Sequence, residues 1–128
     1  MAEERNSLGP LQQQVLDYIW DNPQCTVRHC LDRFNANGNE YAYTTIQTVF
    51  DALHRKRLVS RRRKKNAFVY VARQTRSGML ARNLQELISR FSAGRAPVAS
   101  SLVDALEAGD GAELAAVVAE LKARGYLE

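Results

Sequence analysis

The stretch AYTTIQTVFDALHR, residues 42–55, has the two-sided pattern of an amphipathic helix. Its apolar residues recur at i, i+3, i+4 and i+7, the spacing of a helix that buries one side: Ile46, Val49, Phe50 and Leu53. The opposite side carries short polar groups: Thr44, Thr45, Gln47, Thr48 and Asp51. Threonine is a weak helix former, so helix stability does not explain this composition. The stretch therefore predicts a helix from about Tyr43 to Arg55 whose polar side serves recognition.

Two shorter helices are predicted before this stretch. Pro10 suits the first turn of a helix, where its missing N–H costs nothing, and Asn22-Pro23 ends the helical pattern. The apolar residues between them repeat at helical spacing: Leu11, Val15, Leu16, Ile19 and Trp20. Thr26 is a suitable N-cap for the second helix, which ends at the turn-rich segment 35–39. The three helices are expected to form a trihelical core.

The residues after the third helix change to a period-two pattern, which is typical of β-strands. Segments 60–63 and 68–72 flank Lys64-Lys65-Asn66-Ala67, and Asn66 tolerates the left-handed conformation of a tight turn. This pattern predicts a β-hairpin with a basic tip. Two helices, a polar-faced helix and a basic hairpin follow one another in a winged helix-turn-helix. We therefore predict a mainly α fold with a small β-hairpin wing, α+β in class.

The chain beyond Arg76 is predicted to be all helical. Its apolar residues form three stripes at helical spacing: Leu80, Leu84, Leu87, Ile88 and Phe91, then Val98, Leu102, Val103 and Leu106, then Leu114, Val117, Val118 and Leu121. Pro97 is expected to restart a helix, Asp110 and Glu113 to form a capping box for the next one, and Gly125 to follow its end.

These three short helices bury too little apolar surface to be stable alone, so they must pack on something. A second copy of the same segment is the simplest partner, because two-fold pairing is the commonest assembly. We therefore predict a winged helix-turn-helix domain at residues 1–74 and a three-helix dimerisation domain at 75–128. The expected dimerisation residues are Leu80, Leu84, Leu87, Phe91, Leu102, Leu106 and Leu121.

The charges are distributed unevenly along the chain. Residues 1–51 carry three basic and seven acidic side chains, residues 52–85 eleven basic and none acidic, and residues 86–128 four basic and seven acidic. Although the net charge is only +4, positive potential is therefore concentrated in the middle segment. An acid-free basic segment beside a polar-faced helix predicts a nucleic-acid partner.

Several segments occur in a distinctive order: LQQQVLDYIW (11–20), Thr26-Val27-Arg28, AYTTIQT (42–48), Leu53 followed by Lys56, and Phe68-Val69-Tyr70. Together they resemble the BlaI/MecI family of penicillinase repressors, and the AYTT-x-x-T block is the most specific of them. The order and spacing match over nearly the whole chain. The resemblance implies a homodimeric repressor whose third helix enters the DNA major groove and whose C-terminal helices intertwine with those of the partner.

The chain departs from the family pattern at several positions. Arg57 replaces the glycine that usually ends the recognition helix, and Ala52 replaces an arginine often found inside it. The copper-responsive relatives carry a cysteine-rich C-terminal motif, and this chain has no cysteine after Cys30. Copper sensing by that route is therefore excluded.

The family's penicillinase repressors are inactivated by a protease that cuts an Asn-Phe bond in the C-terminal helices. Aligning their Ser-Leu-Val segment on residues 101–103 places Ala105-Leu106 at the scissile position, so both recognised side chains are missing. An inactivating protease remains an expected partner, but we predict that its cleavage rule is altered or replaced while the fold and operator binding are retained.

We expect the third helix to read bases and the hairpin to contact phosphates. Threonine methyl groups can touch the thymine methyl, and a glutamine amide can pair with the edge of adenine. Arginine and lysine neutralise phosphates without reading sequence, although the basic run could also be a solvated loop. The expected DNA-binding residues are Tyr43, Thr44, Thr45, Gln47, Thr48, Arg55, Arg61, Arg62, Arg63, Lys64 and Lys65.

Cys25, His29 and Cys30 lie within six residues, as a metal or redox sensor could require. They lack a fourth ligand, and Cys30 lies on an apolar stripe, so we favour core thiols and a surface imidazole. His54 is expected to face the groove or solvent. No nucleophile with a base partner, Gly-rich phosphate loop or paired carboxylate motif is present in the sequence. We therefore expect no catalytic residue, no metal, no cofactor and no enzymatic activity.

The sequence thus predicts a sequence-specific repressor that binds double-stranded DNA at a palindromic operator and controls β-lactam-response or similar stress genes. The alternative is a winged-helix module that binds proteins and has an incidental basic wing. Such a module would expose large anchors such as Trp, Tyr or Leu on its third helix rather than Thr and Gln. No apolar run approaches the ~18 residues that cross a bilayer, and MAEERNSLGP is unlike a signal peptide, so we expect a cytoplasmic protein.

Overall fold

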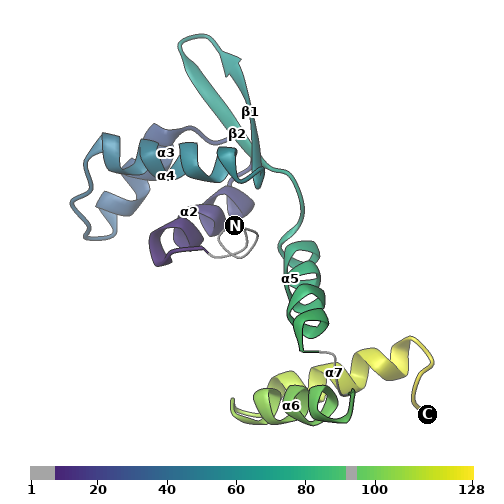
Figure 1. Ribbon diagram of the computed structural model, residues 1–128. Coiled ribbons are helices and arrows are strands. Elements are labelled where there is room, and N and C mark those ends of the chain that lie inside the picture. Colours follow the sequence, from purple (N-terminus) through teal and green to yellow (C-terminus); the bar gives the residue numbers. More distant parts are fainter. Residues whose placement is uncertain (1–7, 92–94) are drawn as a thin grey trace. The chain divides into compact units, whose positions relative to one another are not determined.

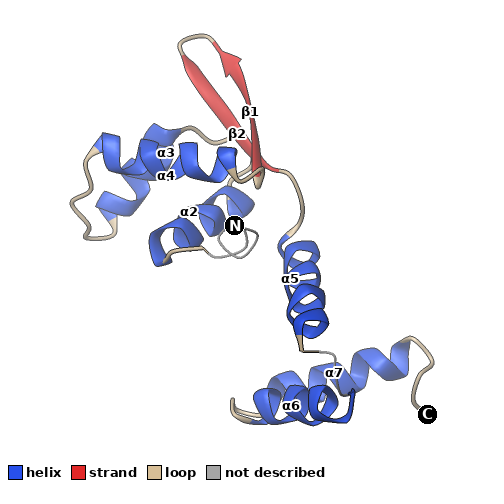
Figure 2. Cartoon of the chain, in the orientation of Figure 1, coloured by secondary structure: helices blue, strands red, loops and turns tan. Residues whose placement is uncertain are grey.

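The computed structural model describes residues 8–91 and 95–128 (Figure 1). Its elements follow in the order α2 (Pro10–Asp21), α3 (Val27–Ala36), α4 (Tyr43–Arg55), β1 (Val59–Lys64), β2 (Ala67–Ala72), α5 (Arg76–Arg90), α6 (Arg95–Glu107) and α7 (Ala112–Ala123). Figure 2 shows the hairpin in red after the first three helices. This order confirms the predicted winged helix-turn-helix followed by three helices. Helix α6 begins at Arg95, two residues before Pro97.

The chain divides into two compact units, one that ends at Asn83 and one that begins at Leu84. We call them the N-terminal unit and the C-terminal unit. The division falls inside α5, which continues from one unit into the other. The predicted domain boundary after residue 74 lies in the connection before α5, and it stays a prediction.

The N-terminal unit is built around the apolar sides of α2, α3 and α4. Residues of all three helices are almost completely buried in one cluster: Val15, Leu16, Ile19, Cys30, Ile46, Phe50 and Leu53. Strand β2 adds Tyr70, whose fully buried ring meets Phe50 edge-on with 4.7 Å between centroids. The core therefore fixes the buried side of α4 and leaves its polar side toward solvent.

The starts of α2 and α3 match the expected caps. Gly9 is the N-cap of α2 and Pro10 its first residue. Thr26 caps α3: its Oγ1 accepts a bond from the His29 N–H at 3.1 Å, and its own N–H donates to His29 Nδ1 at 3.2 Å. His29 thus completes a reciprocal capping box, a role usually filled by Glu or Gln.

Helix α4 ends in a Schellman motif. The Arg57 N–H donates to the His54 carbonyl at 3.0 Å, and the Leu58 N–H donates to the Leu53 carbonyl at 3.1 Å. Arg57 adopts a left-handed backbone with φ of 62°. Glycine is preferred at such a position because it has no Cβ, so the departure from the family pattern at Arg57 carries a conformational cost.

The hairpin pairs β1 with β2 in an antiparallel register that runs from Val59 opposite Ala72 to Lys64 opposite Ala67. This register leaves only Lys65 and Asn66 in the turn. Lys65, and not Asn66, has the left-handed backbone, with φ of 58°. The expectation for Asn66 was wrong because two-residue hairpin turns that match the strand twist need a positive φ at their first central position, which is Lys65.

The start of α5 is attached to α2. Trp20 Nε1 donates to the Gln74 carbonyl at 2.9 Å, and the Arg76 guanidinium lies 5.0 Å from the Trp20 ring centroid. Arg76 also pairs with Asp17 at 3.6 Å and Asp21 at 3.4 Å. Met79, one turn further along, is buried in the core. The connection between the hairpin and α5 is therefore held by several different contacts.

The C-terminal unit contains α6 and α7, which pack on each other. The predicted capping box of α7 was wrong: Gly111, with φ of 84°, is the N-cap, and Asp110 lies one residue before it and accepts a bond from the Ala112 N–H at 3.0 Å. A left-handed glycine turns the chain into the helix here. Gly125, with φ of 85°, follows the α7 C-cap as expected.

No described residue from Leu84 onward is buried. Instead this unit exposes large apolar side chains that include Leu87, Leu102, Val103, Val117, Val118 and Leu127. Among the described residues, no helix combines the length and apolar character that crossing a membrane requires.

Candidate nucleic-acid interface

The N-terminal half of α4 presents the residues that we call the recognition face: Tyr43, Thr44, Thr45, Gln47 and Thr48. Tyr43, Thr44, Thr45 and Thr48 are exposed, and Gln47 is half-buried. Thr48 Oγ1 donates to the Thr44 carbonyl at 2.8 Å, which leaves its methyl group as the outward apolar group. The face therefore offers methyl groups, hydroxyls and one amide, the groups that contact base edges in a major groove.

Asp51 joins the recognition helix to the hairpin, which we call the wing (β1 and β2). Its Oδ1 accepts a bond from Gln47 Nε2 at 3.0 Å and one from Arg61 Nη1 at 3.3 Å. The Arg61 side chain is only 28% exposed, and it also donates to the Tyr70 hydroxyl at 3.5 Å. One carboxylate therefore contacts both a residue of the recognition face and a residue of the wing.

Phe68 organises one side of the wing. The Arg61 guanidinium lies 4.2 Å and the Arg63 guanidinium 5.3 Å from the centroid of its ring. Alternate residues of a strand point to the same side, so these two arginines share the side that faces α4. Stacking on an aromatic ring restrains the long arginine side chains and keeps their N–H groups available.

The other side of the wing carries Arg62 and Lys64. Arg62 Nη2 donates to Gln24 Oε1 at 3.4 Å, while Lys64 is exposed and Lys65 lies in the turn. The predicted basic run is thus divided by strand geometry into two sides and a tip. This division allows the wing to meet phosphates from more than one direction.

Arg28, at the start of α3, also belongs to this surface. Its guanidinium lies 5.0 Å from the Tyr43 ring centroid. A cavity of about 150 Å³ is lined by residues from α3, α4 and the wing, among them Arg28, Tyr43, Gln47, Arg63 and Phe68. Helix α3, helix α4 and the wing therefore meet around one concave, positively charged site.

A family model described as Penicillinase repressor matches residues 8–120, from before α2 into α7. The chain belongs to the penicillinase repressor family. Family membership makes it a DNA-binding transcriptional repressor and a non-enzymatic regulator, which confirms both the resemblance and the expectation that it is not an enzyme. No curated protein matched the chain.

The repressor's predicted DNA-binding residues are not all brought together. Ten of them lie on the recognition face or the wing, but Arg55 lies at the opposite end of α4. There it lines a different cavity, which shares no residue with the one around Tyr43. The contribution of each of these residues to DNA binding stays a prediction.

Four of the repressor's predicted dimerisation residues form an exposed series along α5 and the residue that follows it. The exposed fractions are 58% for Leu80, 41% for Leu84, 45% for Leu87 and 67% for Phe91. On α6, Leu102 is 39% exposed and Leu106 is half-buried, as is Leu121 on α7. Their role in an interface stays a prediction.

Cys25 and Cys30 are buried free thiols in the repressor's core, and His29 is the capping residue described above. Burial raises the pKa of Cys25 to about 11 and that of Cys30 to about 12. Both are therefore protonated at neutral pH and poor nucleophiles. The described residues contain no group of three side chains that could hold a metal ion.

Proposed function

We propose that this repressor acts as a homodimer on a palindromic operator and controls β-lactam-response or similar stress genes. The observation that carries the proposal is the joint surface of the recognition face, Arg28 and the wing around one small cavity. The hydroxyl, methyl and amide groups of the recognition face can contact base edges, and the cations around them can contact phosphates. One unit can therefore supply both the specificity and the affinity for a half-site.

Dimerisation is supported by the apolar surface of the C-terminal unit. Its described residues bury no core of their own, and Leu84 and Leu87 on α5 and Phe91 just after it form an exposed apolar stripe. A second copy would cover these side chains and would place two recognition faces in two-fold symmetry. Symmetric half-sites then follow from protein symmetry.

The test is a footprint on the promoter of the protein's own operon, followed by fluorescence anisotropy with the protected fragment and with a scrambled fragment of the same composition. We expect one palindromic footprint, two protomers per site and much weaker binding to the scrambled DNA. Equal binding to both fragments, together with capture of a protein partner through α4, would instead favour the winged-helix interaction module.

We propose that release from DNA does not depend on cutting at the position of the family's Asn-Phe bond, so that the cleavage rule is altered or replaced. Ala105 and Leu106 lie inside α6, and a helical bond must open locally before a protease can cut it. The experiment exposes the native host to a β-lactam, follows the intact protein by immunoblot and maps fragment ends by mass spectrometry. An intact protein with a derepressed operon supports the proposal, whereas rapid cutting between Ala105 and Leu106 contradicts it.

A further inference from the structure

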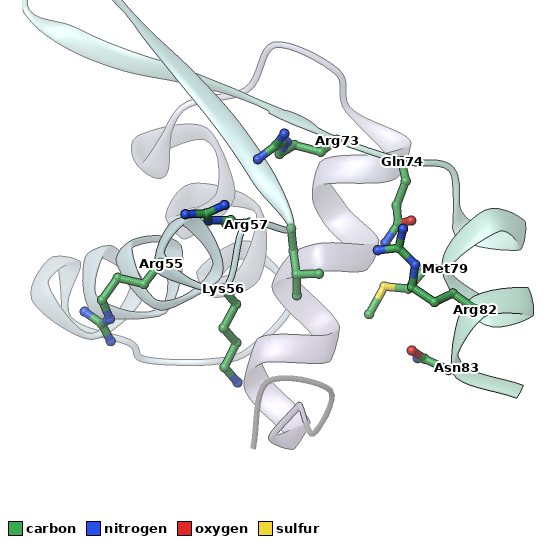
Figure 3. Close-up of a pocket in the computed structure, with 9 residues that line it drawn as sticks. Arg55, Lys56, Arg57, Arg73, Gln74, Met79, Arg82 and Asn83 are labelled. Carbon is green, nitrogen blue, oxygen red and sulfur yellow. The ribbon is translucent and has the colours of Figure 1, made fainter. Parts of the chain in front are cut away.

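A second concave site, which we call the arginine cavity, lies at the C-terminal end of α4 (Figure 3). It has a volume of about 830 Å³, within the range of small-molecule sites. Arg55, Lys56 and Arg57 line it from the end of α4, and Met79, Arg82 and Asn83 line it from the first turns of α5. All its lining residues belong to the N-terminal unit.

The lining of the arginine cavity is strongly cationic. Five of its nine residues are basic and none is acidic: Arg55, Lys56, Arg57, Arg73 and Arg82. By contrast, two arginines elsewhere in this unit form ion pairs with carboxylates: Arg61 pairs with Asp51, and Arg76 pairs with Asp17.

Four of these basic groups have no partner among the described residues. Within residues 8–91 and 95–128, the side chains of Arg55, Arg57, Arg73 and Arg82 make no hydrogen bond or ion pair. Cations that line one concave surface without carboxylates raise the local potential and attract an anion. A ligand with several negative charges would satisfy them together.

Arg57 supports an anion-binding site because its left-handed backbone conformation costs free energy. It adds a cation to the cavity from a left-handed backbone position, where glycine is the favoured residue. Glycine at this position would end α4 with less backbone strain. Backbone strain that the fold does not require often marks a residue kept for binding.

The wall nearer α5 has a different chemistry. Gln74 and Asn83 are half-buried amides, and Met79 adds a buried thioether. The Gln74 backbone is fixed by its bond from Trp20. Amides supply both a donor and an acceptor, the pair that recognises the edge of adenine, and a thioether suits a flat ring.

We infer that the arginine cavity binds a phosphorylated small molecule of nucleotide size, with its phosphates on the arginines and its organic part against Gln74, Asn83 and Met79. Resting on the proposed function, the inference extends to regulation: the bound anion neutralises positive charge in the unit that binds DNA and so lowers operator affinity. By linkage, DNA lowers the affinity for the anion by the same factor.

The direct test is calorimetric titration of the full chain, without DNA, with ATP, pyrophosphate and adenosine as probes. We expect ATP to bind more tightly than pyrophosphate, and adenosine not to bind measurably. The variant Arg73→Ala/Arg82→Ala should weaken ATP binding about tenfold or more, since each removes a charge-assisted contact. Circular dichroism melting confirms that this variant is folded.

The matched control is Arg33→Ala/Lys122→Ala, which removes two exposed positive charges, one from α3 and one from α7, outside the cavity. ATP affinity should be unchanged in this variant. Equal weakening by the control and the double variant would show a diffuse charge effect and overturn the inference. Unchanged ATP binding in the double variant would overturn it as well.

A second arm separates this inference from the proposed function. Saturating ATP should weaken operator binding by the wild type and not by Arg73→Ala/Arg82→Ala. If the double variant lost affinity for all DNA while the wild type bound no ATP, the cavity would be a phosphate-backbone contact and the inference would fail. If the wild type bound ATP in the cavity but recognised no operator, the binding site would stand and the proposed function would fall.

Discussion

The two units of this repressor differ in where their apolar side chains go. All buried hydrophobic residues among those described lie between Val15 and Met79, and none lies in the C-terminal unit. The N-terminal unit therefore contains its own core, whereas the C-terminal unit has helices whose apolar sides face outward. The apolar side of a helix can thus be covered by neighbours in the same chain, as in the N-terminal unit, or by a second copy, as we propose for the C-terminal unit.

Breaking the proposed interface should have the largest effect. Leu84→Asp with Leu102→Asp would place unpaired charges in a shared apolar surface, so we expect monomers by light scattering. Operator affinity should fall by about 10²–10⁴-fold, because the two half-sites are no longer bound together. Ser101→Asp, which adds the same charge beside Leu102 on an exposed polar position, is the control. A dimer that survives both leucine changes would place the interface elsewhere.

Opening the core of the N-terminal unit should come next. Phe50→Ala removes a fully buried ring that contacts Tyr70, and we expect the free energy of unfolding to fall by about 3–5 kcal/mol. In the monomeric background, Val117→Ala should change it by less than about 0.5 kcal/mol, since Val117 is exposed within its own chain. Urea titration measures both, and a comparable loss for the two variants would erase the distinction between the units.

The recognition face should control specificity with little effect on stability. Thr45→Ala and Gln47→Ala are each expected to cost about 1–3 kcal/mol on the operator and much less on random DNA. Thr45 is the cleaner position because Gln47 also bonds Asp51, which holds Arg61. Anisotropy on both DNAs is the measurement. Equal losses of affinity for operator and random DNA would indicate that these side chains contact the DNA backbone and not the bases.

The wing should behave in the opposite way. Replacing Arg62 and Lys64 by alanine should weaken operator and random DNA similarly and lower the salt slope by about one for each lost phosphate contact. Arg33→Ala/Lys122→Ala, which also removes two exposed positive charges but outside the wing, serves as the charge-matched control. Loss of operator affinity alone would mean that the wing reads sequence.

The smallest effect is expected at Arg57. Arg57→Gly relieves a left-handed backbone that costs about 1–2 kcal/mol, but glycine also gains freedom in the unfolded chain. We expect a net stabilisation of roughly 0.5–1 kcal/mol by urea titration. A destabilised Arg57→Gly protein would show that the arginine side chain supports the fold.

The elements that sequence predicts best here are those set by local periodicity. The spacing from Ile46 to Leu53 predicts the bounds of α4 correctly, and Pro10 and Gly125 mark helix ends because their backbone chemistry is local. The capping box predicted for α7 was wrong because the N-cap is Gly111, a left-handed residue without a side chain that could accept a cap hydrogen bond.

The parts of the interface that escaped prediction depend on tertiary contacts. Arg28 was visible only as part of the family block, and nothing local places it on Tyr43. The role of Asp51 arises only when the wing brings Arg61 to α4. The arginine cavity likewise forms only when three segments come together: the end of α4, the residues after β2 and the start of α5. Its cations all belong to the acid-free segment 52–85, but the sequence does not show that they line one cavity.

The bond between Trp20 and the Gln74 carbonyl has an optical consequence. Trp20 is the chain's single tryptophan, and its indole also meets the Arg76 guanidinium. Its fluorescence therefore comes from one place, the attachment of α5 to α2, next to the wall that holds Gln74. Emission wavelength and quenching by iodide report directly, in unlabelled protein, whether that attachment stays closed when DNA or an anion is added.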